Sequence, residues 1–362
     1  MPSSVALKEN KEMVDKELCM SRFLAFRYIE EEDLNFFPGL THVVWKRPAA
    51  GDLHVVGSAD EVERAVREET DAFFVPGRTA IFLSGGIDSA ILASYLPRGT
   101  KAYTFRCVAE GAVNETEQAA RYAAAYGLDH EVIDMYWEDF EELTPELLRH
   151  DGVPFHSIEV QLLKAARRAK ADGFDHLILG ESADGVFGGL DGLLSRDWTL
   201  DGLMDRYSFV RPERALKNPV SVRDVFARYR KPDGVMDIEA FIHGVFCIES
   251  SCSYVHAFDL AGVDALMPYG RMRMAGPLDL ARVRRGESKY LLRELFARRY
   301  PGLPAPRKIP MPRATAQWFA DWRGPTRPEF IPDCQTGMTG DQKWLVWCLE
   351  RFLNAYENGE LA

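Results

Sequence analysis

The stretch Ile81-Phe82-Leu83-Ser84-Gly85-Gly86-Ile87-Asp88-Ser89-Ala90 decides which fold this chain adopts. An apolar run over 79–83 predicts a buried parallel strand, and the apolar segment from Ala90 onward predicts the start of a helix. Between them, the two glycines let the backbone approach a ligand closely, and successive amides with the helix N-terminus form a concavity suited to phosphate. The turn matches neither the Gly-Lys-Ser/Thr of a Walker loop nor the GxGxxG pattern. It therefore predicts a different phosphate-binding turn, with a turn that binds no ligand as the alternative.

Strands and helices alternate on both sides of this stretch. We expect strands at 101–108, 130–134 and 176–179, and helices at 58–74, 114–126, 137–150 and 158–171. This rhythm predicts an α/β fold with a doubly wound parallel sheet, in which ligands bind beyond the carboxyl ends of the strands.

The two ends of the chain show different patterns. Strand-like pieces occur before the stretch at 23–26, 42–45 and 53–56, and strand signals fade after residue 191. Helices are expected in the later part at 207–230, 237–256, 288–300 and 342–354.

These patterns predict the domain organisation. We expect residues 1–75 to be a short lead-in, either the remnant of an N-terminal domain or a linker. Residues 76–362 are expected to form one domain, with a nucleotide-binding sheet in 76–190 and a mainly helical part in 191–362.

The composition narrows the classes of function. A net charge of −11 and a sequence pI of about 5.3 do not favour binding of duplex nucleic acid or tRNA. No apolar run approaches the ~20 residues needed to span a membrane, and the N-terminus lacks a signal-peptide core. Six cysteines are scattered without a CxxC pair, which indicates neither a zinc site nor a disulfide framework. We therefore expect a cytoplasmic protein.

Asp88 and Asp184 are the main candidates for metal binding. Each lies in a glycine-containing loop that follows a predicted parallel strand, so the two carboxylates can converge at one edge of the sheet. Mg²⁺ on a polyphosphate usually takes one or two protein carboxylates together with phosphate oxygens. Either aspartate alone could equally be a helix N-cap, but the pair favours a metal site.

Four motifs in this order resemble a known family. They are 83–89 (Leu-Ser-Gly-Gly-Ile-Asp-Ser), Tyr103-Thr104-Phe105, Gly180-Glu181-x-x-Asp184 and Gly286-x-x-Lys289-x-x-Leu292-Arg293. Over roughly residues 75–320 the chain resembles the synthetase domain of asparagine synthetases, shared with β-lactam synthetases and lasso-peptide cyclases. The resemblance implies a fold of the pyrophosphate-loop ATPase type, similar to adenine nucleotide alpha hydrolases. It also implies formation of an acyl-adenylate from a carboxylate and ATP with Mg²⁺, release of pyrophosphate, and attack by an amine.

The resemblance also implies a nucleotide site. The backbone of Leu83, Cys107 and Gly180 is expected to hold adenine and ribose. The phosphates are expected to lie on a loop that contains Ser84, Gly85, Gly86 and Ser89, with Mg²⁺ on Asp88 and Asp184.

Three further residues are implied to act in catalysis. Glu181 matches a family position that contacts the acyl intermediate or helps to deprotonate the amine, and Lys308 matches a lysine that neutralises charge on the α-phosphate. Glu249 lies one position from an acidic partner of the amine. The alternatives are a solvated surface for Lys308 and an ordinary helix carboxylate for Glu249. Lys289 and Arg293 are expected either to pair with loop carboxylates or to contact phosphate.

Departures from the family pattern bear on the substrate. Only 75 residues precede the predicted domain, against roughly 200 for a glutaminase domain, and we therefore expect no glutamine hydrolysis by this chain. Gly185 replaces a family Glu, and Ser250 and Ser253 replace an Asp and an Arg. The segment 266–271 replaces an Arg-x-Pro-Phe-Leu-Asp stretch, so aspartate is not expected to be the acyl substrate.

The sequence thus favours an ATP-dependent ligase that forms an amide or lactam in specialised-metabolite biosynthesis. Its expected substrates are a small-molecule or peptide carboxylate and an amine or ammonia, with no membrane or nucleic-acid partner. A carrier protein, an ammonia-supplying protein and a second copy of the chain are open alternatives as partners. A tRNA-modifying ATP pyrophosphatase and a nucleotide-binding homologue without catalysis are the alternative functions.

Overall fold

A five-stranded parallel sheet organises the molecule. The computed structural model describes residues 13–306, 309 and 311–361. The strands occur in the order β6-β5-β4-β7-β8 and are all parallel, with bounds β4 Thr79–Phe82, β5 Lys101–Cys107, β6 Asp129–Met135, β7 His176–Ile178 and β8 Asp264–Leu266. The predicted α/β class with a parallel sheet is therefore confirmed. From β4 the chain adds β5 and β6 on one side, and it then adds β7 and β8 on the other side, so the strand order reverses between β4 and β7. In open parallel sheets, ligands bind beyond the carboxyl ends of the strands at this switch point.

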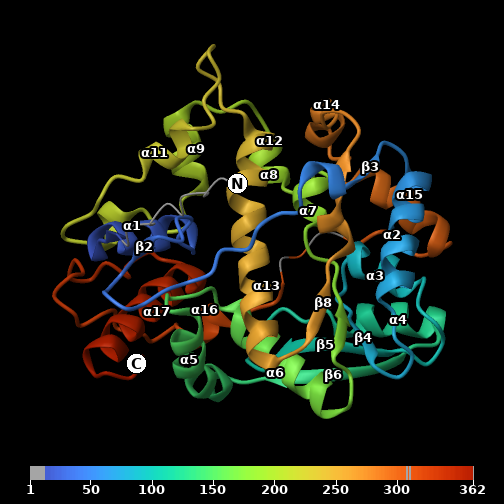
Figure 1. Cartoon of the computed structure of the whole chain (residues 1–362), viewed down its shortest axis with the longest axis horizontal. Helices are drawn as coiled ribbons and strands as arrows, with labels where there is room; N and C mark the ends of the chain where they lie inside the picture. The colour runs from blue at the N-terminus through green and yellow to red at the C-terminus, as the bar shows by residue number, and fades with distance from the viewer. Residues whose placement is uncertain (1–12, 307–308, 310, 362) are drawn as a thin grey trace, which may run out of the picture.

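Helices cover both faces of the sheet (Figure 1). One face packs against α2 Ala59–Phe73, α3 Ile87–Ala93, α4 Thr116–Tyr126 and α15 Tyr290–Arg299. The other packs against α6 Ile158–Ala171 and α13 Cys247–Ala261. The same apolar core extends beyond them to α1 Lys16–Phe26, α5 Trp137–Asp151, α16 Thr315–Trp318 and α17 Gly340–Glu357. Within β4, Ala80 and Phe82 belong to the second core and Ile81 to the first. This alternation explains why the strand reads as a continuous apolar run.

A third apolar cluster lies at the top of Figure 1. It is built mainly by short helices, α8 Asp191–Leu194, α9 Leu200–Tyr207, α11 Arg223–Ala227, α12 Ile238–Phe241 and α14 Leu280–Arg284. At its centre the Phe226 and Phe241 rings stack with centroids 5.3 Å apart. A π-helix, η2 Ile242–Phe246, joins α12 directly to α13.

The described part of the lead-in packs against the rest of the chain. Phe23 and Leu24 of α1 lie in the same core as Phe352 of α17. The strand β3 His54–Val56 pairs in parallel with β9 Met272–Met274, and β1 Met13–Val14 pairs with β2 Leu34–Asn35. The short helices η1 Ala50–Asp52, α7 Ala183–Val186, α10 Pro212–Ala215 and η3 Pro268–Arg271 complete the described elements.

Several predicted elements are confirmed with their boundary signals. Helix α2 begins after Ser58, whose hydroxyl accepts a hydrogen bond from the Glu61 amide. Helix α4 ends at Gly127, which has the positive φ of 65° that favours glycine. The predicted helices 137–150 and 158–171 and the strand at 53–56 are also present, as α5, α6 and β3.

Other predicted elements are wrong. Residues 23–26, expected as a strand, belong to α1, because a short apolar run does not distinguish a buried strand from a buried helix. Residues 42–45 form no strand. The predicted helix 207–230 is two short helices, α10 and α11, since Pro212 and Pro219 interrupt it.

Two boundaries near the site also differ from expectation. Helix α3 begins at Ile87 rather than Ala90, with Gly86 at its N-cap. A strand follows residue 191 after all, since β8 extends the sheet beyond 76–190. Its three residues are too few for a periodic pattern.

Within 13–306, 309 and 311–361, no helix combines the length and the apolar composition of a membrane-crossing segment.

Candidate active site

The loop after β4 forms a closed turn. The Ser84 amide donates to Ser89 Oγ at 2.9 Å, and the Gly86 amide donates to Ser84 Oγ at 3.1 Å. A Cβ on Gly85 would lie 2.8 Å from Cβ of Glu115, so this position requires glycine. The turn therefore delivers Asp88 and Ser89 into the first turn of α3. The amides of a first helical turn have no partner within the helix.

The loop after β7 packs directly on the loop after β4. A Cβ on Gly180 would lie 2.8 Å from the Ser89 amide nitrogen, and a Cβ on Gly189 would lie 2.1 Å from Asp184 Oδ1. Between these glycines, Ser182 adopts a φ of 72°, which is strained for a residue other than glycine. The two loops thus share one surface at the carboxyl ends of β4 and β7.

Lys289 joins the two predicted metal ligands. Its Nζ lies 2.5 Å from Asp88 Oδ2 and 2.6 Å from Asp184 Oδ1. The side chain is buried, and the residue has a left-handed φ of 52°. Burial alone lowers the pKa of the ammonium, but the Asp88 and Asp184 carboxylates outweigh it and raise the pKa above its usual value. Of the two alternatives for Lys289, the structure shows the pairing with loop carboxylates.

The convergence of Asp88 and Asp184 provides a test of fit for Mg²⁺. Both carboxylates reach one cation, here the Lys289 ammonium, beside a loop that presents backbone amides. Two carboxylates with open positions for phosphate oxygens are the donor set that Mg²⁺ takes on a polyphosphate. The residues present fit that ion, provided that the Lys289 ammonium shifts away from the carboxylates.

A pocket of about 220 Å³ opens beside these loops. Its lining combines charged side chains, such as Asp88 and Lys289, with the rings of Phe82, Phe105 and Tyr254. Most predicted site residues line it: Leu83, Ser84, Gly86, Asp88, Ser89, Gly180, Glu181 and Asp184. Gly85 lines an adjoining pocket together with Glu115. Lys308 lies outside the described residues, although its neighbours Pro306 and Ile309 line the main pocket.

Glu181 is a buried acid at the pocket wall. Its Oε1 accepts a hydrogen bond from Ser250 Oγ at 2.8 Å. Burial raises the pKa of the Glu181 carboxyl, and hydrogen bonds from the Ser182 amide and the Ser250 hydroxyl partly oppose this. A carboxyl with a raised pKa is better matched to accept a proton near neutral pH. Ser250, noted above only as a departure from the family, therefore contacts the candidate acid–base group directly.

Glu249 lies elsewhere. It does not line the pocket and is 1% exposed, with Oε2 accepting a hydrogen bond from Arg27 Nη2 at 2.7 Å. His156 accepts a hydrogen bond from the same guanidinium. Burial raises the pKa of Glu249, and the Arg27 guanidinium opposes that rise. This is the environment of a buried ion pair that joins α1 to α13.

The Cys107 side chain also faces away from the pocket. Its thiol lies 3.2 Å from Gln161 Nε2 and 3.5 Å from the Pro312 carbonyl oxygen, and burial raises its pKa to about 11. Its predicted contact was through the backbone at the end of β5, where Phe105 lines the pocket.

Sequence reasoning missed Glu115 and Tyr254. Burial raises the pKa of the Glu115 carboxyl, which the Gly85 amide opposes by hydrogen bonding. Tyr254 lies one turn after Ser250 on the same face of α13 and borders the pocket. The helical spacing of 250 and 254 was a usable signal for Tyr254, but nothing in the local pattern distinguishes Glu115 from other acids at a helix start.

Fold and site together define an α/β protein with a glycine-rich, amide-presenting loop and paired carboxylates at the switch point of a parallel sheet. Residues 58–233 match the family model for asparagine synthase, which is consistent with a synthetase domain of that family. At the level of the family, this match indicates an ATP-dependent, amide-forming ligase. The matched region contains both loops, whereas Glu249, Lys289 and Lys308 lie beyond it. None of the curated proteins that were compared matches the chain.

Proposed function

We propose that this chain adenylates a carboxylate with ATP, releases pyrophosphate, and joins the acyl group to ammonia or a substrate amine as an amide or lactam. We further propose that the product is a specialised metabolite and that the fold is of the pyrophosphate-loop ATPase type. The observation that carries the proposal is the convergence of Asp88 and Asp184 on one cation beside the amide-presenting loop. Two carboxylates that can share one Mg²⁺ beside a phosphate-binding turn suit ATP, whose β and γ phosphates leave together as pyrophosphate.

The residues of the two loops divide the work. The first amides of α3, at the end of the Ser84–Ser89 turn, would bind the outer phosphates, and Asp88 and Asp184 would hold Mg²⁺. When bound, that ion neutralises charge on the departing pyrophosphate. Lys289 holds the two aspartates together until the ion replaces its ammonium, and Lys308, as predicted, would place a positive charge near the α-phosphate.

Glu181 is proposed to take the proton from the attacking amine. Its raised pKa and its hydrogen bond from Ser250 suit a base that works near neutral pH. Glu249 has no assigned step here, since it pairs with Arg27 outside the pocket.

The acyl-acceptor side differs from the family for a physical reason. A Cβ on Gly185 would lie 2.2 Å from Cys247 Sγ, so α13 occupies the space that a family Glu would need. We infer that the carboxylate substrate is not aspartate, because Gly185, Ser250 and Ser253 replace charged residues that the family carries at these positions.

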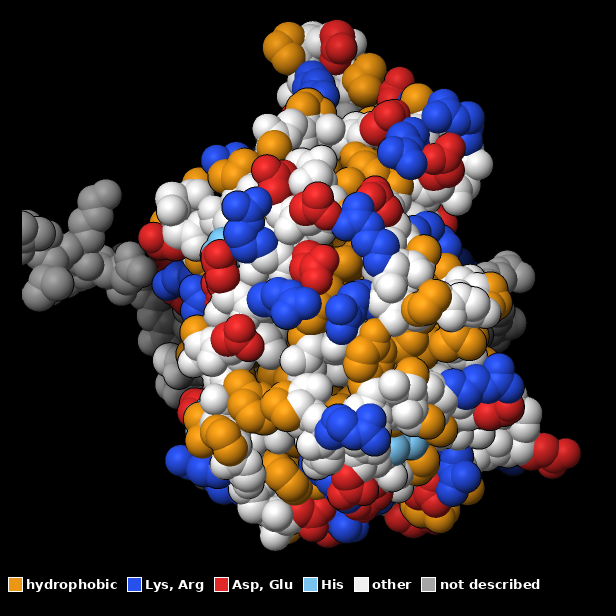
Figure 2. Space-filling view, turned by 90° about the vertical axis from the view of Figure 1, so that its right-hand side faces the viewer, with side chains coloured by type: hydrophobic (Ala, Val, Ile, Leu, Met, Phe, Trp, Pro, Cys, Tyr) orange, Lys and Arg blue, Asp and Glu red, His pale blue; other side chains and the backbone are white. Residues whose placement is uncertain are grey.

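Two alternative functions, tRNA modification and nucleotide binding without catalysis, are distinguished from this one by experiment. On the face that carries α2 and α15, acidic and basic side chains are interspersed, as in the ion pairs of Arg298 with Asp60 and Glu294 (Figure 2). An acidic chain with such a face does not favour tRNA as the substrate. A nucleotide-binding protein without catalysis would keep the pocket but release no pyrophosphate.

The experiment measures pyrophosphate and AMP after incubation with MgATP and a panel of small-molecule and peptide carboxylates, with ammonia as the nucleophile. The proposal expects carboxylate-dependent AMP formation that Asp184→Asn abolishes. Asp191→Asn is the matched control, because Asp191 lies shortly after Asp184, is exposed and does not line the pocket. AMP formation that needs tRNA, or none with any acceptor, would overturn the proposal.

A further inference from the structure

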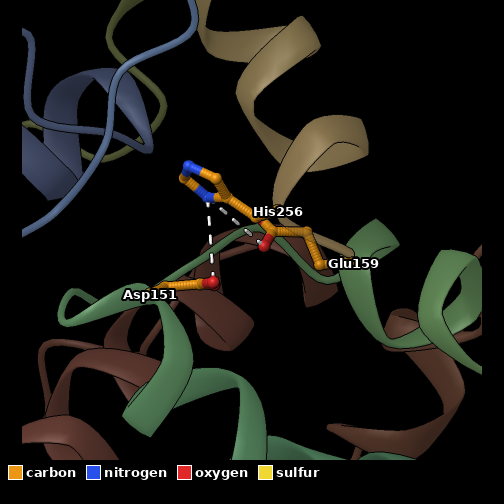
Figure 3. A group of neighbouring side chains, drawn as sticks. All are labelled: Asp151, Glu159 and His256. Atoms are coloured by element: carbon orange, nitrogen blue, oxygen red, sulfur yellow. Dashed lines mark ion pairs between the residues drawn. The ribbon is translucent and has the colours of Figure 1, made fainter. Parts of the chain in front are cut away.

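A second group of side chains with ligand chemistry lies away from the pocket. Asp151 at the end of α5, Glu159 in the first turn of α6 and His256 in α13 each place one ligand atom within 4.8 Å of the other two (Figure 3). None of the three lines the pocket described above. They come from three separate helices, so no spacing in the sequence predicts that they meet.

The hydrogen bonding of His256 fixes which ring nitrogen faces the acids. Its Nε2 lies 2.8 Å from the Val43 carbonyl oxygen, which can only accept, so Nε2 carries the proton. The other nitrogen, Nδ1, lies 3.9 Å from Asp151 Oδ1 and 4.0 Å from Glu159 Oε2. In a neutral ring, Nδ1 then presents a lone pair toward two carboxylates, and three electron-rich atoms face one point (Figure 3).

Both carboxylates are buried. Asp151 and Glu159 are each 3% exposed, and Glu159 Oε2, the atom that faces His256, makes no hydrogen bond of standard geometry within the described residues. Burial and the nearby Asp151 raise the pKa of Glu159, and a hydrogen bond from Ser253 opposes that rise. Two of the other oxygens are held, Asp151 Oδ1 by His150 Nδ1 at 2.7 Å and Glu159 Oε1 by the His156 amide at 3.3 Å. The ion pairs found for the two acids in the described part of the chain involve only histidines. The two buried acids lie close together and repel each other when both are ionised, and a cation between them would relieve that repulsion.

We propose that Asp151, Glu159 and His256 bind one first-row divalent metal ion of the Zn²⁺ class. Zinc bonds to nitrogen and oxygen are about 2.0–2.2 Å long, which places the ligand atoms of a tetrahedral site about 3.4 Å apart. The observed separations of 3.9 and 4.0 Å approach this value, and side-chain rotation closes the difference. One imidazole with two carboxylates suits such an ion, whereas Mg²⁺ and Ca²⁺ prefer oxygen ligands alone.

The surroundings of the three ligands support a metal site. Metal-binding histidines commonly donate their second ring N–H to a carbonyl, as His256 does to Val43. His150 bridges Asp151 and Asp259, which holds the Asp151 carboxylate in place. These contacts fix the orientation of two of the three ligands before any ion binds.

The site joins segments that are distant in the sequence. Gly152, with a φ of 66°, packs so closely on the 41–43 segment that a Cβ would lie 2.2 Å from the Thr41 carbonyl oxygen. A bound ion would fasten this junction of α5 and α6 to α13, the helix that also carries Ser250 and Tyr254 of the pocket. The ion is therefore expected to stabilise the fold and to take no part in adenylation.

The test begins with the wild-type chain. After chelation and desalting, it is titrated with Zn²⁺ and with Co²⁺ as a spectroscopic probe. One equivalent of either ion is expected to bind at micromolar concentration, and Zn²⁺ is expected to raise Tm by at least about 3 °C. Proton NMR of the Co²⁺ form should show one shifted exchangeable proton, the Nε2–H that donates to Val43. Failure to bind one equivalent, or binding without this signal, would overturn the proposal even if every variant misfolded.

Variants then assign the ligands. His256→Gln and Glu159→Gln are expected to weaken Zn²⁺ binding by more than about 100-fold, since loss of a ligand exceeds the effect of losing an outer contact. His54→Gln is the matched control: His54 also pairs with two glutamates, but through opposite ring nitrogens, so they do not converge. Unchanged Zn²⁺ affinity in folded His256→Gln would contradict the assignment.

Discussion

At the residue scale, the candidate active site depends on one buried lysine held between two aspartates. Lys289→Met should destabilise the chain by about 3 kcal/mol, because both carboxylates lose the buried ammonium that lies between them. Urea unfolding measures this, and millimolar Mg²⁺ should restore stability in the variant more than in the wild type if Asp88 and Asp184 bind the ion.

A second lysine provides the control. Lys101 also contacts two acids, Asp129 and Glu131, but the Asp129 side chain is 63% exposed, so Lys101→Met should cost less than about 1 kcal/mol and show no response to Mg²⁺. If the two lysine variants behaved alike, Lys289 would not be the link between the loops.

Ser250 tunes the candidate base. Its hydroxyl holds the pKa of Glu181 below the level that burial alone would give, so Ser250→Ala should raise that pKa further. Since a base works only when deprotonated, the acidic limb of the pH profile of kcat/KM should move to higher pH. Ser195→Ala, an exposed control, should leave the profile in place. An unmoved acidic limb in Ser250→Ala would remove Glu181 from the role of base.

Lys308 remains a prediction from the family resemblance. If it stabilises charge on the α-phosphate, Lys308→Ala should lower kcat by about 10²–10³-fold with little change in KM for ATP. Steady-state kinetics decides this, and an unchanged kcat would place the residue outside the reaction.

At the element scale, α7 and α13 explain the clearest departure from the family. Gly185→Ala should cost about 1–3 kcal/mol, because its Cβ would collide with Cys247 Sγ on α13. Adding Cys247→Ala removes that sulfur, and the double variant should recover most of the loss in a double-mutant cycle. Additive costs would show that some other contact selects glycine at 185.

The elements predictable from sequence are those with long regular patterns. The run of strands and helices from α2 to β7 was largely predictable because several of its helices have an amphipathic period, and some have a recognisable capping residue, such as Ser58 or Gly127. Strand β8 was missed because three residues carry no period, and α1 was mistaken for a strand because its last turn is uniformly apolar.

The candidate site was predictable only in part. The loop residues stand next to recognisable strands, so local sequence located Asp88 and Asp184. The position of Lys289 between them, the burial of Glu249 against Arg27 and the meeting of Asp151 with His256 depend on contacts between distant segments. Those contacts are set by packing, which no local pattern records.

At the scale of the whole molecule, the sheet, both loops and α13 serve one reaction if the chain forms an acyl-adenylate. In that reaction a carboxylate oxygen attacks the α-phosphate and remains with AMP when the amide forms. Acyl-adenylate formation therefore predicts that one oxygen atom of the carboxylate ends up in AMP. This prediction does not depend on the role of any one residue.

The most direct measurement follows ¹⁸O from the carboxylate. The wild-type chain is incubated with MgATP, ammonia and the ¹⁸O-labelled carboxylate that supports AMP formation, and AMP is analysed by mass spectrometry. Acyl-adenylate formation predicts AMP that carries one ¹⁸O atom and pyrophosphate that carries none. The Asp184→Asn variant should transfer no label to AMP. Unlabelled AMP, or ADP with labelled phosphate in its place, would contradict it.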